Sequence, residues 1–429
     1  MEFQIQTIID NYYKENKLEL VDLTLSKHLD NLISIIFSKI ENIDDYYDEI
    51  EDKNKLPISI NKIFYLEYQK YIQPYLNKVN NQIIKLDAIP LVNQREEGWY
   101  AFRNELISAS SIHNVLNYTK PNSLLLEKIG VSMPFLQNEA IIHGIIFEIV
   151  SQYLYESRNN IKIREYGCIP HDTHSFIGAS PDGVVHDIND NDEYNVHRLA
   201  LTGRLLEIKN PSSRKITNSI KPSYYSQIIA QQEVCCLPIC DFLETKFDKY
   251  ENMDDFLKCQ LLDSEPQNIV NHYIPLCNLS SNYKEKGILL KFSKDRGYTS
   301  ELYPLHIPYK KEEIEVWIDK KVDEYKKNDF KFEQAIYWQL SEYSVQTVKF
   351  ENSKWEKLYT KSKQLWDDVL EYRKLSDNEI LEKIKNYELE LIDTDLKEVK
   401  PSDTKYKLRN VQKKRQLEIK TVDISKYNF

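Results

Sequence analysis

The chain has 429 residues and a formal net charge of −10, from 57 Lys and Arg against 67 Asp and Glu. This length predicts one large domain with extensions, or two domains. No run of about 18 apolar residues occurs, and the N-terminus lacks the apolar region of a secretory signal, so no membrane association is expected. The acidic balance argues against a protein coated in nucleic acid, although it allows a local basic cleft.

The six cysteines are expected to be reduced thiols, because a large chain without a secretory signal does not indicate a disulfide framework. The segment "CCLPIC" at 235–240 lacks the paired spacing of a zinc or iron–sulfur site, so buried core thiols are the favoured interpretation. These features predict a cytoplasmic protein, with the nucleus as the alternative.

Residues 1–90 are predicted to form a helical extension. Residues 41–57 are an acidic linker, and residues 60–79 are a second amphipathic segment that Pro74 is expected to interrupt. The extension either packs on the main domain or docks a partner. The periodicity of the first helix, at spacings of three and four, is carried by Leu25, Leu29, Leu32, Ile33, Ile36 and Ile40.

Residues 91–345 are predicted to form one domain in which helices alternate with strands, which is typical of an α/β or α+β fold. The expected elements are strands at 175–180, 199–209, 239–247, 286–293 and 299–308, helices at 222–236 and 310–328, and a polar loop at 186–197. The domain should therefore contain a mixed central sheet flanked by helices.

The C-terminal part is predicted to consist of a helical segment, 346–396, with an amphipathic helix at 352–375, and a flexible tail, 397–429. The tail carries ten Lys and Arg against four acids. It either adds salt-dependent DNA affinity or keeps the chain soluble.

Two short segments, "GASPDGVV" at 178–185 and "LLEIKNP" at 205–211, carry two acids and a lysine. Side chains alternate across a strand, so Glu207 and Lys209 share one face while Leu206 and Ile208 share the other. Asp182 lies in a Pro-Gly turn, where its carboxylate can join that of Glu207. Two converging carboxylates can hold Mg²⁺, and a nearby lysine can orient or deprotonate a metal-bound water and stabilise charge on a phosphate.

The simplest interpretation of Glu-x-Lys alone is a solvated ion pair on a sheet. The preceding "SPDG" turn favours a site for phosphodiester hydrolysis instead, and together the segments resemble the PD-(D/E)-x-K nuclease superfamily. Further segments resemble one branch, the phage lambda exonuclease-like (YqaJ-type) viral recombinase nucleases. In family order these segments are "EGWYAFRNELISASSI" at 97–112, "HGIIFE" at 143–148, "GASPDG" at 178–183 and "YYSQIIAQQEV" at 224–234.

The resemblance implies a restriction-endonuclease-like core with helical additions at both ends, and a catalytic set. This set is Glu148, Asp182, Glu207, Lys209 and Gln227, with Mg²⁺ (or Mn²⁺ in its place) held by Glu148, Asp182, Glu207 and the carbonyl of Ile208. Glu148 follows Gly144 by one helical turn, which leaves room beside the carboxylate. Tyr224 and Gln231 share the helical face of Gln227 as supporting residues, although Gln231 could equally be polar surface.

The resemblance also implies a pocket for the 5′-terminal phosphate of DNA, made by Arg103, Ser110 and Ser180. An arginine fork with hydroxyl groups suits a phosphate. The alternative is that Ser110 caps a helix and Arg103 is a surface residue.

We therefore expect a Mg²⁺-dependent exonuclease acting 5′→3′ on double-stranded DNA in recombination, repair or viral DNA processing. A single-strand annealing protein is the expected partner, and a viral source would place the enzyme in the host cytoplasm. The family's phage member is a ring-shaped trimer, but the long extensions here leave only a homo-oligomer as the expectation. The alternatives are an endonuclease or flap nuclease with the same site, and a catalytically silent DNA-binding scaffold.

Overall fold

The structure is a computed structural model of the full chain. It describes residues 1–40, 56–90, 103–118, 123–132, 139–188, 194–217, 219–258, 285–294, 297–305, 307, 309–376, 378–380, 382–383 and 407–408. The linker expected at 41–57 and the basic tail therefore lie almost entirely outside the described residues, as do Cys259, Cys277 and the stretch 91–102.

Helices occur in three groups along the chain. The first group is α1 (Glu2–Asn16), α2 (Leu20–Leu23), α3 (Ser26–Ile40) and α4 (Leu56–Asp87). The second is the 3₁₀ helix η2 (Ile112–Val115), α6 (Ser123–Lys128), α7 (Glu139–Asn159), α8 (Val196–Leu201) and α9 (Pro222–Cys235). The third is α10 (Met253–Lys258), α11 (Lys311–Lys326) and α12 (Asn352–Tyr372).

The strands form one large sheet and two small ones. The seven-stranded sheet has the order β10 (Gly297–Leu302), β9 (Lys286–Lys294), β11 (Lys331–Lys349), β8 (Ile239–Lys249), β7 (Leu205–Lys209), β6 (Gly183–Ile188) and β3 (Ile161–Arg164). A three-stranded sheet has the order β1 (Ile107–Ser108), β5 (Ile177–Ala179) and β4 (Ile169–Pro170), and β2 (Val131–Ser132) pairs with β12 (Lys407–Leu408).

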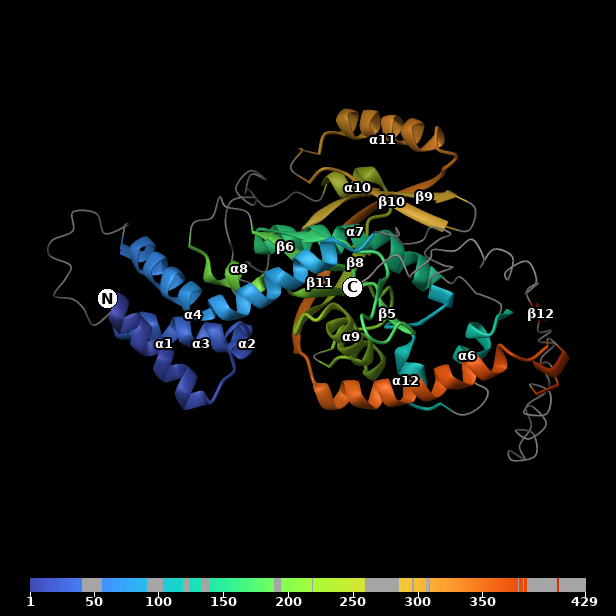
Figure 1. Ribbon diagram of the computed structural model, residues 1–429. Coiled ribbons are helices and arrows are strands. Elements are labelled where there is room, and N and C mark those ends of the chain that lie inside the picture. Colours follow the sequence, from blue (N-terminus) through green and yellow to red (C-terminus); the bar gives the residue numbers. More distant parts are fainter. Residues whose placement is uncertain are drawn as a thin grey trace.

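The large sheet is mixed and has helices on both faces. Only its β7–β8 pair is parallel among the described pairings, while the other pairs are antiparallel. Side chains of α7 pack with β8, β9 and β11 on one face, and α9 packs on the other face, with α12 beyond it (Figure 1). The predicted α/β class with a mixed, helix-flanked sheet is confirmed.

The N-terminal helices share the main hydrophobic core with α9 and the strands beside it. A buried ion pair joins the two parts: Arg204 donates to both carboxylate oxygens of Asp241 at 3.0 and 3.1 Å and also to the carbonyl of Thr24. Tyr155 and Thr347 donate to the same carboxylate at 2.6 Å each. Because every oxygen of Asp241 is hydrogen-bonded, this buried charge pair is compatible with a stable core.

Three elements differ from the sequence-based expectations. Helix α4 continues through Pro74, because the flanking Ile72 and Tyr75 are buried in the core, and this packing outweighs the roughly 3 kcal/mol that an internal proline costs. Of the strand expected at 199–209, residues 199–201 belong instead to helix α8, which the Asn195 side chain caps, and 202–204 lie in a turn, so only 205–209 is strand. The long strand β11, which the sequence analysis did not anticipate, lies in the middle of the sheet.

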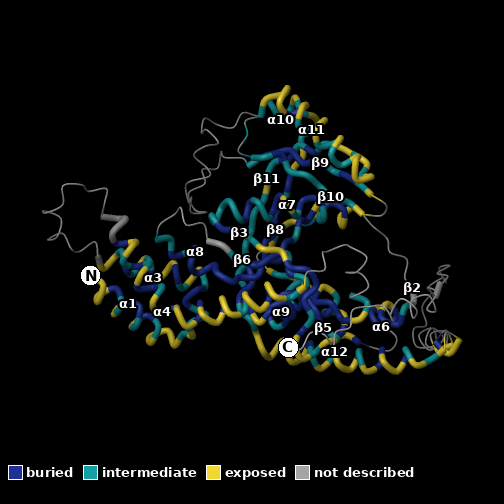
Figure 2. The backbone as a smooth tube through the Cα atoms, turned by 45° about the horizontal axis from the view of Figure 1, so that its top comes forward, coloured by how far each residue is buried: buried dark blue, intermediate teal, exposed yellow. Residues whose placement is uncertain are grey.

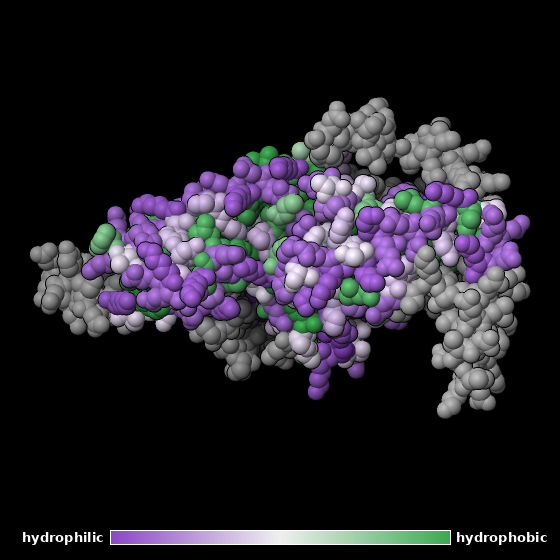
Figure 3. Space-filling view, turned by 60° about the horizontal axis from the view of Figure 1, so that its bottom comes forward, coloured by the Kyte–Doolittle hydropathy of each residue, from purple (hydrophilic) through white to green (hydrophobic). Residues whose placement is uncertain are grey.

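Exposure follows this layering. Strands β7 and β8 are mostly buried and β11 is mostly intermediate, while the outer faces of α11 and α12 are exposed (Figure 2). On the side where α12 lies, hydrophilic residues cover most of the surface and hydrophobic residues are scattered (Figure 3). Among the described helices, none is both long and apolar enough to cross a membrane.

Candidate active site

The sheet places Asp182 beside the end of β7. Strand β7 pairs antiparallel with β6, so the turn that precedes β6 lies next to β7. The backbone N–H of Ile208 donates to Asp182 Oδ2 at 2.6 Å. Leu206 and Ile208 enter the core on the α7 face, as the alternation in "LLEIK" predicts, while Glu207 faces α9, with Lys209 hydrogen-bonded to it.

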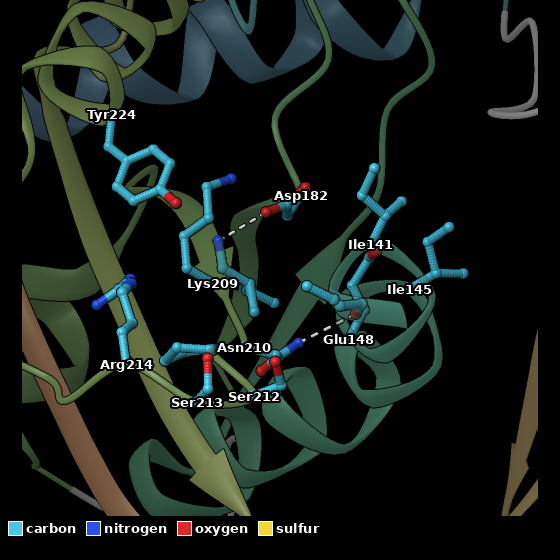
Figure 4. A pocket seen from close by; sticks show the side chains of 14 residues that line it. Ile141, Ile145, Glu148, Asp182, Lys209, Asn210, Ser212, Ser213, Arg214 and Tyr224 are labelled. Atoms are coloured by element: carbon cyan, nitrogen blue, oxygen red, sulfur yellow. Dashed lines mark hydrogen bonds between the residues drawn. The ribbon is translucent and has the colours of Figure 1, made fainter. Parts of the chain in front are cut away.

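A pocket of about 570 Å³ opens at this point. Glu148 lines it from α7, Asp182 from the turn, Ile208 and Lys209 from β7, and Tyr224 from α9. Figure 4 shows Glu148 on the α7 side and Lys209 and Tyr224 on the opposite side. The structure thus brings together five residues that are far apart in the sequence and that the motifs selected.

Glu207 does not line the pocket but lies behind it, with 1% of its surface exposed. Its Oε1 accepts hydrogen bonds from Lys209 Nζ and, at 2.8 Å, from Gln227 Nε2, and its Oε2 accepts from Gln231 Nε2 at 2.6 Å. Gln231 is fully buried, so of its two expected roles the structure favours support over polar surface. Both glutamines fix the carboxylate of Glu207, and neither lines the pocket.

The acids of the site affect each other. Burial and the neighbouring carboxylates of Glu207 and Glu148 raise the pKa of Asp182 well above its usual value. Burial disfavours the charge of Lys209, but the Glu207 and Asp182 carboxylates outweigh it and raise the pKa of Lys209. The carboxylates thus favour the charged ammonium form of Lys209, which donates a hydrogen bond to Glu207.

The donor set fits a hard divalent cation in its chemistry. Asp182 and Glu148 present carboxylates to one pocket, and oxygen ligands are those that Mg²⁺ prefers. The repulsion that raises the pKa of Asp182 is what a cation would relieve. The described residues contain no group of three His, Cys, Asp or Glu side chains already arranged around a metal position, since Glu207 is engaged with Lys209 and the glutamines.

Sequence reasoning missed Asn210, which joins β7 to α7. Its Oδ1 accepts from Ser151 Oγ at 2.6 Å and from Thr245 Oγ1 at 2.7 Å, and its Nδ2 donates to the carbonyl of Gly144 at 3.2 Å. It therefore holds the turn of α7 that carries Glu148. An added Cβ at Gly144 would meet no atom within 4 Å, in agreement with the open space expected beside that carboxylate. The only sequence signal for Asn210 was its place directly after Lys209.

Arg214 and the serines before it were also missed. Ser212, Ser213 and Arg214 line the pocket, and Arg214 is ion-paired to the buried Glu244. The guanidinium lies 5.9 Å from the ring centre of Tyr224. A loop rich in Ser and Lys gave no specific signal.

The predicted phosphate-binding residues meet at the small sheet. Arg103 Nη2 donates to the hydroxyl groups of Ser110 and Ser108, each at 2.9 Å. Parallel pairing of β1 with β5 places Ser108 beside Gly178, two residues before Ser180. Apart from the neighbouring Cys168 thiol, the buried Oγ of Ser180 has no hydrogen-bond partner among the described residues. Ser108 was missed, although it is the first serine of the quoted "SAS".

Comparisons with known proteins agree with the motifs. Residues 98–235 match the YqaJ-like viral recombinase domain. The resemblance is confirmed, and the matched range 98–235 contains every residue that the motifs assigned to the catalytic and phosphate-binding sets.

Two curated viral proteins are similar to this chain. An uncharacterized protein of Acanthamoeba polyphaga mimivirus is 32% identical over 358 residues, which are 77% of this chain and 60% of that protein. A protein of African swine fever virus is 31% identical over 151 residues, which are 31% of this chain and 43% of that protein. The chain thus spans less than two thirds of the length of either relative.

Among solved structures, two of an alkaline exonuclease from Laribacter hongkongensis (LHK-Exo), one in complex with dAMP, are similar at 16% and 17% identity. Each has a TM-score of 0.34 and covers 69% of this chain and 100% of the other.

Proposed function

We propose that this protein is a Mg²⁺-dependent DNA exonuclease that degrades duplex DNA in the 5′→3′ direction. The observation that carries the proposal is the pocket at the end of β7, where Asp182, Glu148 and Lys209 meet beside the buried Glu207. The YqaJ-like domain match supports the same reaction class.

In this proposal Glu148, Asp182 and the carbonyl of Ile208 would hold the cation from the pocket lining, and Glu207, directly behind them, would be the further ligand that the resemblance implies. When bound, Mg²⁺ would neutralise the carboxylates and the phosphate and favour the hydroxide form of the attacking water. Lys209 donates to the charge that develops on the phosphate, while Gln227 and Gln231 keep Glu207 oriented. Arg103, Ser110 and Ser180 bind the terminal phosphate and so place the scissile bond over the pocket.

The proposed substrate is double-stranded DNA, and the proposed setting is recombination, repair or viral DNA processing with a single-strand annealing partner. A homo-oligomer in the host cytoplasm is part of the same proposal. The alternatives are an endonuclease or flap nuclease, and a silent DNA-binding scaffold. The complete set of Glu148, Asp182, Glu207, Lys209 and Gln227 argues against the scaffold, because a degenerate nuclease would be expected to have lost at least one member.

One assay separates these functions. The protein is incubated with end-labelled linear duplex and with closed circular duplex, each with Mg²⁺ and with EDTA. An exonuclease releases nucleotides from the linear duplex alone and only with Mg²⁺. Cleavage of closed circles would establish the endonuclease, and intact DNA under all conditions would refute a nuclease function.

A further inference from the structure

A buried lysine that the catalytic proposal does not use lies next to Arg103. Lys128 ends α6, and 2% of its side chain is exposed. Its ammonium donates to the carbonyl of Arg103 at 3.0 Å and to Glu127 Oε1 at 2.8 Å. An ammonium has three donors, and the third has no acceptor among the residues that the structure describes.

The environment of Lys128 disfavours its positive charge. Burial lowers the pKa of Lys128, Glu127 opposes that effect, and the positive charges of Arg103 and Arg373 add to it. Glu127 is a weak counter-ion, because 54% of its side chain is exposed to water. A buried cation beside another cation is a common sign of a site whose anion arrives with the ligand.

Lys128, Arg103 and Ser180 all lie near the thiol of Cys168. Burial raises the pKa of the Cys168 thiol, while the Ser180 hydroxyl and the charges of Arg103 and Lys128 lower it, so all three groups lie near that thiol. The otherwise unpartnered Oγ of Ser180 and the third donor of Lys128 are thus neighbours of the Arg103–Ser108–Ser110 cluster.

A residue outside the matched range 98–235 holds the backbone around Arg103 and Lys128. Arg373, which follows α12, donates to the carbonyl of Lys128 at 2.9 Å and to that of Asn104 at 3.2 Å, and forms an ion pair with Glu105 at 2.6 Å. Both chain segments that carry the cations are therefore held in place before any ligand binds.

We propose that Lys128 is a second cation of the phosphate pocket and that it selects a terminal phosphate monoester over an internal diester. This proposal rests on the proposed function. A terminal monoester bears up to two negative charges near neutral pH, whereas each internal diester bears one. Arg103 with the serines can bind either group, and the second cation adds attraction mainly for the dianion.

The test compares initial rates on matched duplexes that carry a 5′-phosphate or a 5′-hydroxyl. We expect Lys128→Met to lower the ratio of the two rates about tenfold, and Lys128→Arg to retain much of it, because the charge is kept. Inorganic phosphate should inhibit the wild type competitively on the 5′-phosphate duplex and do so less well with Lys128→Met. The exposed Lys85→Met is the matched control and should leave both rates unchanged.

A second variant guards against a misfolded Lys128→Met protein. Glu127→Gln removes the competing anion from an exposed position, and we expect it to raise the rate ratio about twofold to threefold. If Lys128 had only a structural role, Lys128→Met would lower the rates on both duplexes by the same factor, and Glu127→Gln would leave the ratio of the two rates unchanged. These two results together would overturn the proposal. A wild-type protein that cuts no DNA would instead refute the proposed function itself.

Discussion

The acidic pocket at the end of β7 and the proposed cationic pocket beside β1, which contains Arg103 and Lys128, are opposite in charge and similar in design. In the first, the half-buried Asp182 lies beside Glu148 and Glu207, and its pKa is raised by burial and by these like charges. In the second, Lys128 is buried beside Arg103, and its pKa is lowered by burial and by like charges that include Arg103. Each pocket brings like charges together. Their repulsion lowers the stability of the folded protein as long as no ligand of opposite charge is bound.

The two pockets differ in how they are supported. Glu207 is held by side chains on α9 and Asp182 by the backbone of β7, so the acidic pocket depends on the large sheet. The cationic pocket is held by the three-stranded sheet, through the pairing of β1 with β5, and by Arg373 after α12. The comparison indicates that changes in the first pocket should alter the rate of hydrolysis, whereas changes in the second should alter which DNA end is preferred.

The largest effect is expected when a carboxylate of the acidic pocket is removed. Asp182→Ala or Glu207→Ala should lower nuclease activity by roughly 10³-fold or more, as should EDTA with the wild type, because the cation would lose its ligands. Release of acid-soluble nucleotide measures the activity, and circular dichroism checks the fold. The exposed Asp319→Asn on α11 is the control. Full activity in either purified alanine variant would show that the hydrolytic centre lies elsewhere.

Loss of the ammonium group should have the next largest effect. Lys209→Ala should reduce kcat about 100-fold with little change in KM, because the ammonium is proposed to stabilise charge that develops during hydrolysis and to do little in substrate binding. Steady-state kinetics on a 5′-phosphorylated duplex provide both constants. A variant with normal kcat and a strongly raised KM would make Lys209 a phosphate anchor and weaken the distinction between the two pockets.

The cationic pocket should control the preference for DNA ends. The wild type should degrade 5′-phosphorylated duplexes faster than 5′-hydroxyl duplexes, and Arg103→Ala should remove most of that difference, of about tenfold or more, while metal-dependent cleavage persists. Initial rates on duplexes that differ only in the 5′ group measure this. Equal wild-type rates on the two ends would contradict the assignment of Arg103, Ser110 and Ser180.

The smallest effect is expected behind the acidic pocket. Gln231→Leu removes the donor to Glu207 Oε2 and leaves a buried carboxylate oxygen without it, which costs about 1–3 kcal/mol. Activity should fall about tenfold and the thermal unfolding midpoint should drop by several degrees. Calorimetry and the nucleotide-release assay test both. If Gln231→Leu were as stable and as active as the wild type, Glu207 would not depend on α9 for its orientation.

The sequence alone indicated the acidic pocket because most of its residues belong to short, local sequence motifs. Alternation in "LLEIK" placed Glu207 and Lys209 on one face, and the "SPDG" turn marked Asp182 at the start of a strand. The helix at 222–236 was predicted as well, and the "HGIIFE" motif marked the helical turn of α7 that carries Glu148. These features depend on residues within a few positions of each other, where backbone geometry fixes the side-chain directions.

Only the tertiary structure decided which distant residues complete each site. Asn210 contacts Gly144 and Thr245, and Lys128 contacts Arg103, yet no local pattern marks Asn210 or Lys128 as functional. Pro74 is a further example. Its local propensity predicts a break in the helix, but its buried neighbours pack in the core and α4 continues through it. Local sequence determines the shape and facing of each element, but the contacts between elements depend on long-range packing, and packing decided where the buried charges meet.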